Sequence, residues 1–224
     1  MIGVGFALLL EFIDTSIKSP ADVARRVDLP VLGVIPHTDD LDEDIPDLRL
    51  AFLTNPNSLF GEAFRQLRTS MLFAGPAGQH RSLLVTSSLP GDGRGTVALN
   101  LAAAIAHGGK KVLVVDANFR QPMCRKVFTD CPEEGLSNAL VGHGDWRDYV
   151  HEVEPNYHVL SAGPLPPNPA ELLGSDHMRN LLSEMNAQYD QVIFDGAPCL
   201  LLSHSPVLSN LLARVLRVVL AGPN

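Results

Sequence analysis

A glycine-rich loop between an apolar strand and an apolar helix is the feature that most constrains this chain. Residues 83–86 (LLVT) are expected to form a buried strand, the loop follows over residues 88–95, and a helix is expected from Thr96 to His107. A strand that enters such a turn places several backbone N–H groups and the positive end of the helix around one anion-sized hollow. The sequence therefore predicts a phosphate-binding loop, with a tight glycine turn that binds nothing as the alternative.

The loop reads SLPGDGRGT over residues 88–96 and matches the phosphate-loop pattern G-x-x-x-x-G-K-[ST] only in part. In that pattern the Lys reaches the β- and γ-phosphates of a nucleotide, and the Ser or Thr hydroxyl binds Mg²⁺. Here Gly93 is retained, Arg94 stands in place of the Lys, and Gly95 stands in place of the hydroxyl. Arg keeps the charge but is bulkier than an ammonium, and Thr96 could reach a metal only if the loop shifted by one residue. The candidate nucleotide-binding residues are Pro90, Gly91, Asp92, Gly93, Arg94, Gly95 and Thr96.

Three aspartates lie in or beside this loop. Asp92 is inside it, where a carboxylate that points at phosphate would repel the ligand and one turned to solvent would be harmless. Asp116 and Asp195 each end an apolar run, and strand ends at the carboxyl edge of a parallel sheet line the ligand crevice. Either one alone could be a helix cap, but two of them at strand ends beside a glycine loop are harder to explain as caps.

Apolar runs without polar alternation predict the rest of the fold. The runs Lys111–Asp116, His158–Leu160, Val192–Asp195 and Val215–Leu220 are expected to be strands, and residues 171–187 and 204–213 are expected to be helical. Strands buried on both faces are typical of a parallel sheet covered by helices on both sides. The sequence therefore predicts a three-layer α/β fold of the P-loop NTPase type, with a mostly parallel sheet.

The chain is predicted to divide into an N-terminal segment, residues 1–57, and a main domain, residues 58–224. The uncharged stretch Ile2–Leu10 is far shorter than the ~20 apolar residues that cross a bilayer. It is therefore either a core or amphipathic helix, or the tail of a membrane helix that lies upstream.

Between this stretch and the main domain the sequence predicts a short helix over Ala21–Val27 and a strand over Val31–Ile35. Six of the nine residues from Asp39 to Asp47 are acidic, which is typical of a solvated linker. A helix is expected to begin at about Ser58, because apolar residues recur after it at helical spacing.

Composition excludes several classes of function. Seventeen basic and 25 acidic residues give a net charge of −8, which disfavours nucleic acid as a partner. Three cysteines without paired spacing fit a reducing cytoplasm rather than a disulfide framework or a zinc site. The eight histidines show no metal-binding spacing, and the serines of the loop lack evident partners for hydrolase chemistry.

Motifs outside the loop form a combination that can be compared with known families. They are VLGVIP (31–36), EAFRQLRT (62–69), VVDANFRQP (114–122), GLS (135–137), AG (162–163), PPNPAELL (166–173) and FDGAP (194–198). Over essentially the whole chain they resemble the cytoplasmic domain of the bacterial tyrosine kinases (BY-kinases) that control polysaccharide export, a branch of the MinD/ParA-like P-loop ATPases. The resemblance implies binding of ATP and Mg²⁺ and transfer of phosphate to tyrosine.

The same resemblance implies partners and a location. Glu62, Arg65 and Arg68 match a helix through which the family assembles into ring-like homo-oligomers. The membrane part of a polysaccharide co-polymerase is the implied partner, at the cytoplasmic face of the bacterial inner membrane. No nucleic-acid partner is implied.

The departures from the family pattern concentrate in the chemistry. Family members use two aspartates of the second motif together with the Walker B aspartate on Mg²⁺ and the incoming tyrosine. Here the matching catalytic positions are Asp116, Asn118 and Asp195, and Asn118 cannot accept a proton as a base. Losing a full charge ~4 Å from a divalent ion would cost several kcal/mol, so poor retention of Mg²⁺ and ATP is expected.

Other parts of the pattern are also missing. The sequence reads SHSP over residues 203–206, where the family usually has an acidic residue, and it lacks the tyrosine-rich tail that follows the domain in the family. The resemblance and these departures together leave three alternative functions. The favoured one is a pseudokinase-like scaffold with weak or absent ATP binding, the second is an active tyrosine autokinase in which Arg94 and Thr96 compensate, and the third is a MinD/ParA-type positioning ATPase.

Overall fold

The structure is a computed structural model and describes residues 23, 29–37, 43, 45–74, 81–200 and 204–221. A six-stranded sheet with the order β3-β4-β2-β5-β1-β6 forms its centre. The strands are β1 Ser82–Ser87, β2 Val112–Asp116, β3 Val150–Glu154, β4 Tyr157–Leu160, β5 Gln191–Asp195 and β6 Arg214–Val218. All neighbouring strands are parallel except β3, which pairs antiparallel with β4. The predicted, mostly parallel α/β sheet is therefore confirmed.

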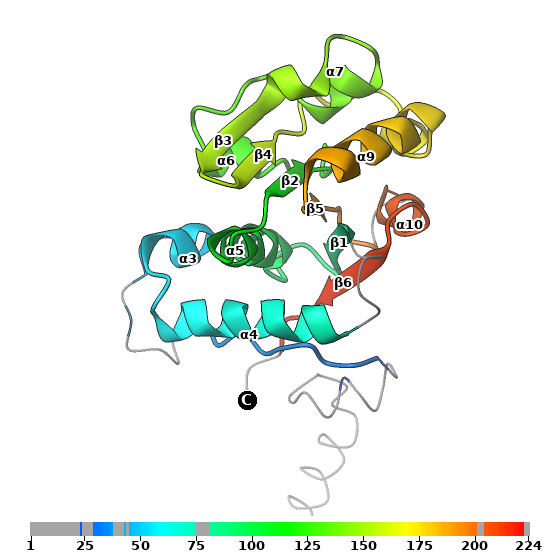
Figure 1. The fold of residues 1–224 in the computed structure, drawn as a ribbon. Helices are drawn as coiled ribbons and strands as arrows, with labels where there is room; N and C mark the ends of the chain where they lie inside the picture. The colour runs from blue at the N-terminus through cyan, green and yellow to red at the C-terminus, as the bar shows by residue number, and fades with distance from the viewer. Residues whose placement is uncertain are drawn as a thin grey trace, which may run out of the picture.

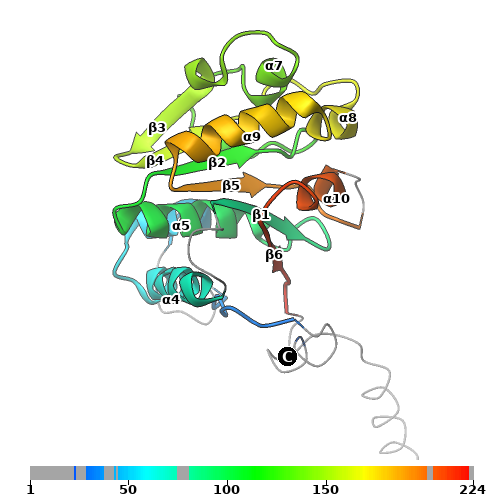
Figure 2. The ribbon, with the colours of Figure 1, turned by 45° about the vertical axis from the view of Figure 1, so that its right-hand side comes forward.

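Helices cover both faces of this sheet (Figures 1 and 2). On one side α5 lies against the strands and α4 packs beneath α5, with the short η2 and α3 beside them; α9 crosses the opposite side. The helices are η2 Leu48–Leu50, α3 Ala51–Thr54, α4 Leu59–Phe73, α5 Arg94–His107, α6 Cys124–Val127, α7 Leu136–Leu140, η3 Trp146–Tyr149, α8 Pro169–Leu173, α9 Asp176–Gln188 and α10 His204–Ser209.

Alternate residues of the central strands feed two separate hydrophobic clusters, as the period of two along a strand requires. In β1, Leu83 and Val85 belong to the cluster under α4 and α5, whereas Leu84 belongs to the cluster under α7, α8, α9 and α10. The same alternation holds in β2, where Val114 and Val115 face opposite sides. This arrangement explains why the strands read as continuous apolar runs.

Several predicted boundaries need correction. Val31–Ile35 is not a strand, because residues 29–37 form no regular structure. Side chains of this segment pack instead against the hydrophobic cluster under α4 and α5. An added Cβ at Gly33 would lie 3.5 Å from the Leu67 side chain, so this segment lies against α4 and not beside a sheet edge. The predicted helix over 171–187 is interrupted at Gly174, which caps α8, while Ser175 caps α9.

The predicted N-terminal segment is described only in part. Ile2–Leu10 lies outside the described residues. Of Ala21–Val27 only Val23 is described, and most of the acidic stretch Asp39–Asp47 is also outside the described residues. The division between residues 57 and 58 stays a prediction. Residues 48–54 of that segment are helical, and Phe52 is 1% exposed in the same cluster as α4 and α5.

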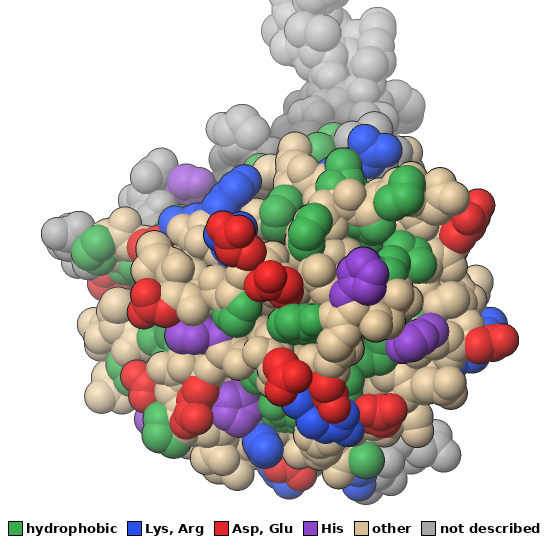
Figure 3. All heavy atoms as spheres, turned by 90° about the horizontal axis from the view of Figure 1, so that it is seen from above, with side chains coloured by type: hydrophobic (Ala, Val, Ile, Leu, Met, Phe, Trp, Pro, Cys, Tyr) green, Lys and Arg blue, Asp and Glu red, His purple; other side chains and the backbone are tan. Residues whose placement is uncertain are grey.

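Two surface properties bear on possible partners. In the part of the chain that the structure describes, no helix has the length and apolar character that crossing a bilayer requires. On the face over α7 and α9, acidic, basic and apolar side chains are interspersed, and no continuous basic stripe is visible there (Figure 3). That face therefore offers no extended electrostatic footprint for nucleic acid.

Candidate nucleotide site

The predicted strand, loop and helix are present in the predicted order. All six residues of β1 are buried, and α5 begins at Arg94, two residues earlier than expected. Gly91 and Gly93 have φ values of +93° and +81°, a region that favours glycine, and Gly93 is the N-terminal cap of α5. The first N–H groups of α5 have no partner within the helix, so the loop has the backbone form of an anion cradle.

Asp92 makes a hydrogen bond within the loop. Its Oδ2 accepts a hydrogen bond from the Leu89 backbone N–H at 3.0 Å, which closes the loop on itself. The side chain therefore has a structural role within the loop.

Asp116 and Asp195 lie side by side at the carboxyl ends of β2 and β5, where they are paired in register. Both are 0% exposed. Asp116 accepts backbone N–H bonds from Asn118 at 3.2 Å, Met123 at 2.6 Å and Cys124 at 3.0 Å. Its carboxylate thus holds the segment that follows β2 in place, a role that the sequence did not reveal.

Burial dominates the electrostatics of this pair. It raises the pKa of Asp195 to about 7; the Arg94 guanidinium opposes the rise, and the Asp116 carboxylate adds to it. Burial also raises the pKa of Asp116, although the three backbone N–H bonds oppose that rise. Two adjacent buried carboxyl groups therefore need a cation nearby if both are to be charged.

Arg94 provides that positive charge. Its Nε lies 3.2 Å from Oδ1 of Asp195 and donates to the carbonyl oxygen of Gly196 at 2.5 Å. The Asp195 carboxylate accepts no hydrogen bond from the described residues, and its contact with Arg94 is an ion pair. Arg94 stands in the position of the phosphate-binding Lys, but its Nε contacts the end of β5 instead.

Gly95 and Asn118 are two of the positions at which the sequence departs from the family pattern. An added Cβ at Gly95 would lie 3.6 Å from Oδ2 of Asp195, where a hydroxyl could share a metal with that carboxylate, but only 2.6 Å from Cε of Met123. Met123 therefore fills the space beside Gly95. Asn118 is buried, and its Nδ2 donates to the carbonyl of Gln121 at 2.9 Å, so it shapes the turn after β2.

Sequence reasoning did not identify Met123. It follows the VVDANFRQP motif directly, and nothing in its spacing marks it as a neighbour of Gly95. The bonds from the backbone N–H groups of Met123 and Cys124 to Asp116 hold this segment beside the loop.

The residues assigned to self-association are bonded within the chain. Arg65 pairs with Glu62 through Nη2 at 2.6 Å and also donates to the carbonyl of Pro56. Arg68 donates to the carbonyl of Ala104 at 2.6 Å, near the end of α5. These contacts fasten α4 to its neighbours, whatever further role the three side chains have.

Two of the three tyrosines of the chain are buried, and the third, Tyr149, is half-buried. Tyr157 is fully buried and donates to the carbonyl of Leu99 at 3.2 Å, and Tyr149 donates to the carbonyl of His143. Tyr189 is 6% exposed, with the Lys111 ammonium 4.8 Å from its ring centre. Tyr157 and Tyr189 are therefore not accessible as phosphate acceptors, whereas part of Tyr149 reaches the surface.

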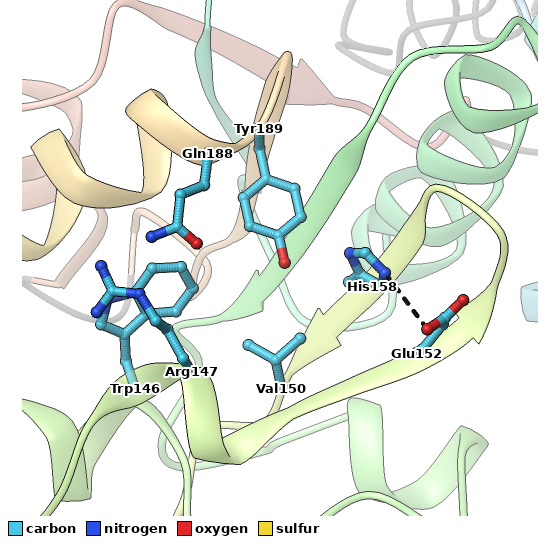
Figure 4. A pocket seen from close by; sticks show the side chains of 7 residues that line it. All are labelled: Trp146, Arg147, Val150, Glu152, His158, Gln188 and Tyr189. Carbon is cyan, nitrogen blue, oxygen red and sulfur yellow. Dashed lines mark ion pairs between the residues drawn. The ribbon is translucent and has the colours of Figure 1, made fainter.

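A separate surface pocket of about 230 Å³ lies between η3, the strands β3 and β4, and the end of α9 (Figure 4). It is lined by Trp146, Arg147, Val150, Glu152, His158, Gln188 and Tyr189. The Arg147 guanidinium lies 4.8 Å from the Trp146 ring and pairs with Asp145 and Glu184, each at 2.9 Å. Because this cation is already paired, the pocket offers no free positive charge for a phosphate.

Comparison with known proteins gives consistent results. A family profile described as an AAA domain matches residues 83–212. The chain is 39% identical over 171 residues to the tyrosine-protein kinase YwqD of Bacillus subtilis (strain 168), which covers 76% of this chain and 72% of YwqD. It is 37% identical over 171 residues to the tyrosine-protein kinase Etk of Escherichia coli (strain K12), which covers 76% of this chain and 24% of Etk.

Solved structures agree with these sequence matches. The kinase domain of the Escherichia coli tyrosine kinase ETK has a TM-score of 0.82 at 32% identity, covering 93% of this chain and 84% of that one. The cell division ATPase MinD of Pyrococcus furiosus, at 24% identity and a TM-score of 0.51, shares the fold alone. The likeness to the kinase domain therefore extends over the loop and over the framework around it.

Proposed function

The chain belongs to the family of bacterial tyrosine kinases, and we propose that it acts as a kinase-like scaffold in a polysaccharide export system, with weak or absent ATP binding. Family membership implies ATP and Mg²⁺ as ligands. The proposal is therefore that this member has kept the domain and has lost part of the site that holds the metal.

One observation carries the proposal: the position of the metal-binding hydroxyl is Gly95, and Met123 occupies the space beside it. The loop and both buried aspartates are retained, so the framework of the site is intact. A thioether is a soft ligand and does not replace the oxygen that Mg²⁺ prefers.

The proposed setting rests on the resemblance and on the names of the relatives. We assign the chain to the cytoplasmic face of the inner membrane, where the membrane part of a polysaccharide co-polymerase would be its partner. The chain spans about a quarter of the length of Etk, 24%. The membrane partner and the exported polymer therefore belong to the proposal.

An active tyrosine kinase is the second candidate, and the names of the relatives favour it. In that case Thr96 would have to supply the missing hydroxyl, and Arg94 would have to leave Asp195 for the phosphates. The second change would break the Arg94–Asp195 ion pair described above, so we favour the scaffold.

Thermal unfolding with nucleotides separates these functions. We expect millimolar ATP or ADP with Mg²⁺ to leave the melting temperature unchanged, because only a ligand that binds the native state raises stability. The measurement is a thermal-shift series with ATP, ADP and Mg²⁺, alone and combined. A Mg²⁺-dependent rise of several degrees, together with phosphotyrosine formed on a tail peptide, would establish the kinase instead.

Self-association through α4 is part of the proposed scaffold and can be tested by Arg65→Ala combined with Arg68→Ala. We expect smaller particles in sedimentation velocity, because both guanidinium groups of the proposed ring contact are removed. We also expect a loss of about 1–3 kcal/mol in the free energy of unfolding, since Arg68 donates a charged hydrogen bond to the end of α5.

Arg81→Ala is the matched control, because Arg81 also donates to a backbone carbonyl, that of Asn186 at 2.8 Å, but lies outside α4. Identical sedimentation of the double variant and the parent, measured at a temperature where both are folded, would remove the ring from the proposal.

A further inference from the structure

The Arg94 side chain reaches across the loop to the end of β5 and is only 11% exposed there. Its contacts with Oδ1 of Asp195 and with the carbonyl of Gly196 place a guanidinium against a fully buried carboxylate. In enzymes with an intact phosphate loop, a divalent metal ion held near the acidic residues supplies the positive charge at this point.

The local charges require such a cation. Asp116 and Asp195 are paired in register on neighbouring strands, and both are completely buried. A buried carboxylate is stable in its charged form only with a paired charge or several hydrogen bonds. Asp116 has three backbone N–H partners, whereas the described residues offer Asp195 only the Arg94 guanidinium.

The residues do not fit Mg²⁺. This ion demands near-octahedral oxygen coordination, but Gly95 offers no hydroxyl and Met123 brings sulfur to that position. Both oxygens of Asp116 already accept backbone N–H bonds. Among the residues that the structure describes, no group of three His, Cys, Asp or Glu side chains could hold a metal.

We propose that Arg94 is a built-in counter-cation that replaces the divalent metal of this site, so that the site takes no Mg²⁺. The inference rests on the weakened site proposed above and names what has taken the place of the metal. A guanidinium is permanently charged and has five N–H donors.

A double-mutant cycle tests the counter-cation. We expect Arg94→Gln to lower the melting temperature, because it leaves Asp195 buried without its cation. Adding Asp195→Asn should recover much of that loss, since the uncompensated charge is then gone. Arg94→Lys, which keeps a positive charge, should lie closer to the parent than Arg94→Gln does.

The matched control is the same cycle on an exposed pair of the same residue types, Arg179→Gln with Asp176→Asn on α9, where we expect no coupling. Additive losses at Arg94 and Asp195 would overturn the proposal. If Arg94→Gln fails to fold while the double variant folds, the coupling is supported. If neither folds, the metal measurement on the parent chain decides.

That measurement is electron paramagnetic resonance of Mn²⁺, used as the probe for a divalent metal. We expect no stoichiometric Mn²⁺ binding to the parent chain at millimolar metal, with or without ADP. Mn²⁺ that binds one to one and is lost in Asp195→Asn would overturn the inference. A chain that bound Mn²⁺ in this way but formed no phosphotyrosine could still be a scaffold. The counter-cation and the scaffold function can therefore fail separately.

Discussion

The triple variant Arg94→Lys, Gly95→Ser and Asn118→Asp is expected to bind Mg²⁺·ADP at least about a hundredfold more tightly than the parent chain. A restored hydroxyl and a restored carboxylate each supply oxygen to the metal, and each 1.4 kcal/mol gained is about tenfold in affinity. The backbone of the loop already has the required form, with Gly93 as the cap of α5. Isothermal titration with ADP and Mg²⁺ measures the change.

Met123 limits this gain. A side chain at position 95 would meet the Met123 thioether before it reached Asp195. The thioether is flexible and can move, but a smaller residue would remove the conflict, so adding Met123→Ala to the triple variant should tighten binding further. Met123→Ala alone is the control and should bring no gain, because it supplies no metal ligand. If neither multiple variant binds more tightly than the parent, then the crevice itself has been remodelled.

The sequence predicted the sheet well because burial on both faces leaves a strong signal. Leu83, Leu84 and Val85 must all be apolar, since they alternate between two clusters that helices cover. The antiparallel edge strand β3, in contrast, was not predicted. Its residues are only half-buried or exposed, and the run VHEVE carries two acidic residues. Such a strand is set by its pairing with β4 and not by its own composition.

The apolar run Val31–Ile35 shows the opposite error. Its composition is that of a strand, and two of its side chains, Leu32 and Ile35, do pack on the core. Nothing in its composition shows whether a sheet edge or the surface of a helix receives it. Here the contact is with Leu67 on α4, and the segment stays irregular.

At the candidate site, the sequence located the loop and the two buried aspartates but not their partners. Residues 94 and 195 are remote in the chain, and their ion pair depends on β5 lying next to β1. The same holds for Met123, which is brought to Gly95 by the bonds to Asp116. Motif spacing reports residue types along the chain, whereas these contacts depend on which strands are neighbours.

Residues 48–54 are the clearest case in which the tertiary structure adds to the sequence. They fall in the segment predicted to precede the main domain, after the acidic stretch. Asn100 on α5 accepts a hydrogen bond from the Phe52 N–H at 2.7 Å and donates to the carbonyl of Leu48 at 2.7 Å. One buried amide thus ties this segment to the helix that begins at the phosphate loop.

We therefore expect Phe52→Ala to lower the free energy of unfolding by about 3–5 kcal/mol, the usual cost of removing a buried aromatic ring and leaving a cavity. The ring is 1% exposed and makes an edge contact with His107, at 5.8 Å between ring centres. Phe73→Ala, the same substitution at a residue that is 84% exposed, is the control and should change stability by less than about 0.5 kcal/mol. Urea denaturation followed by circular dichroism measures both. Equal, small effects would mean that residues 48–54 do not belong to the folded core, because a ring in an attached linker contributes nothing to the cooperative unfolding of the domain.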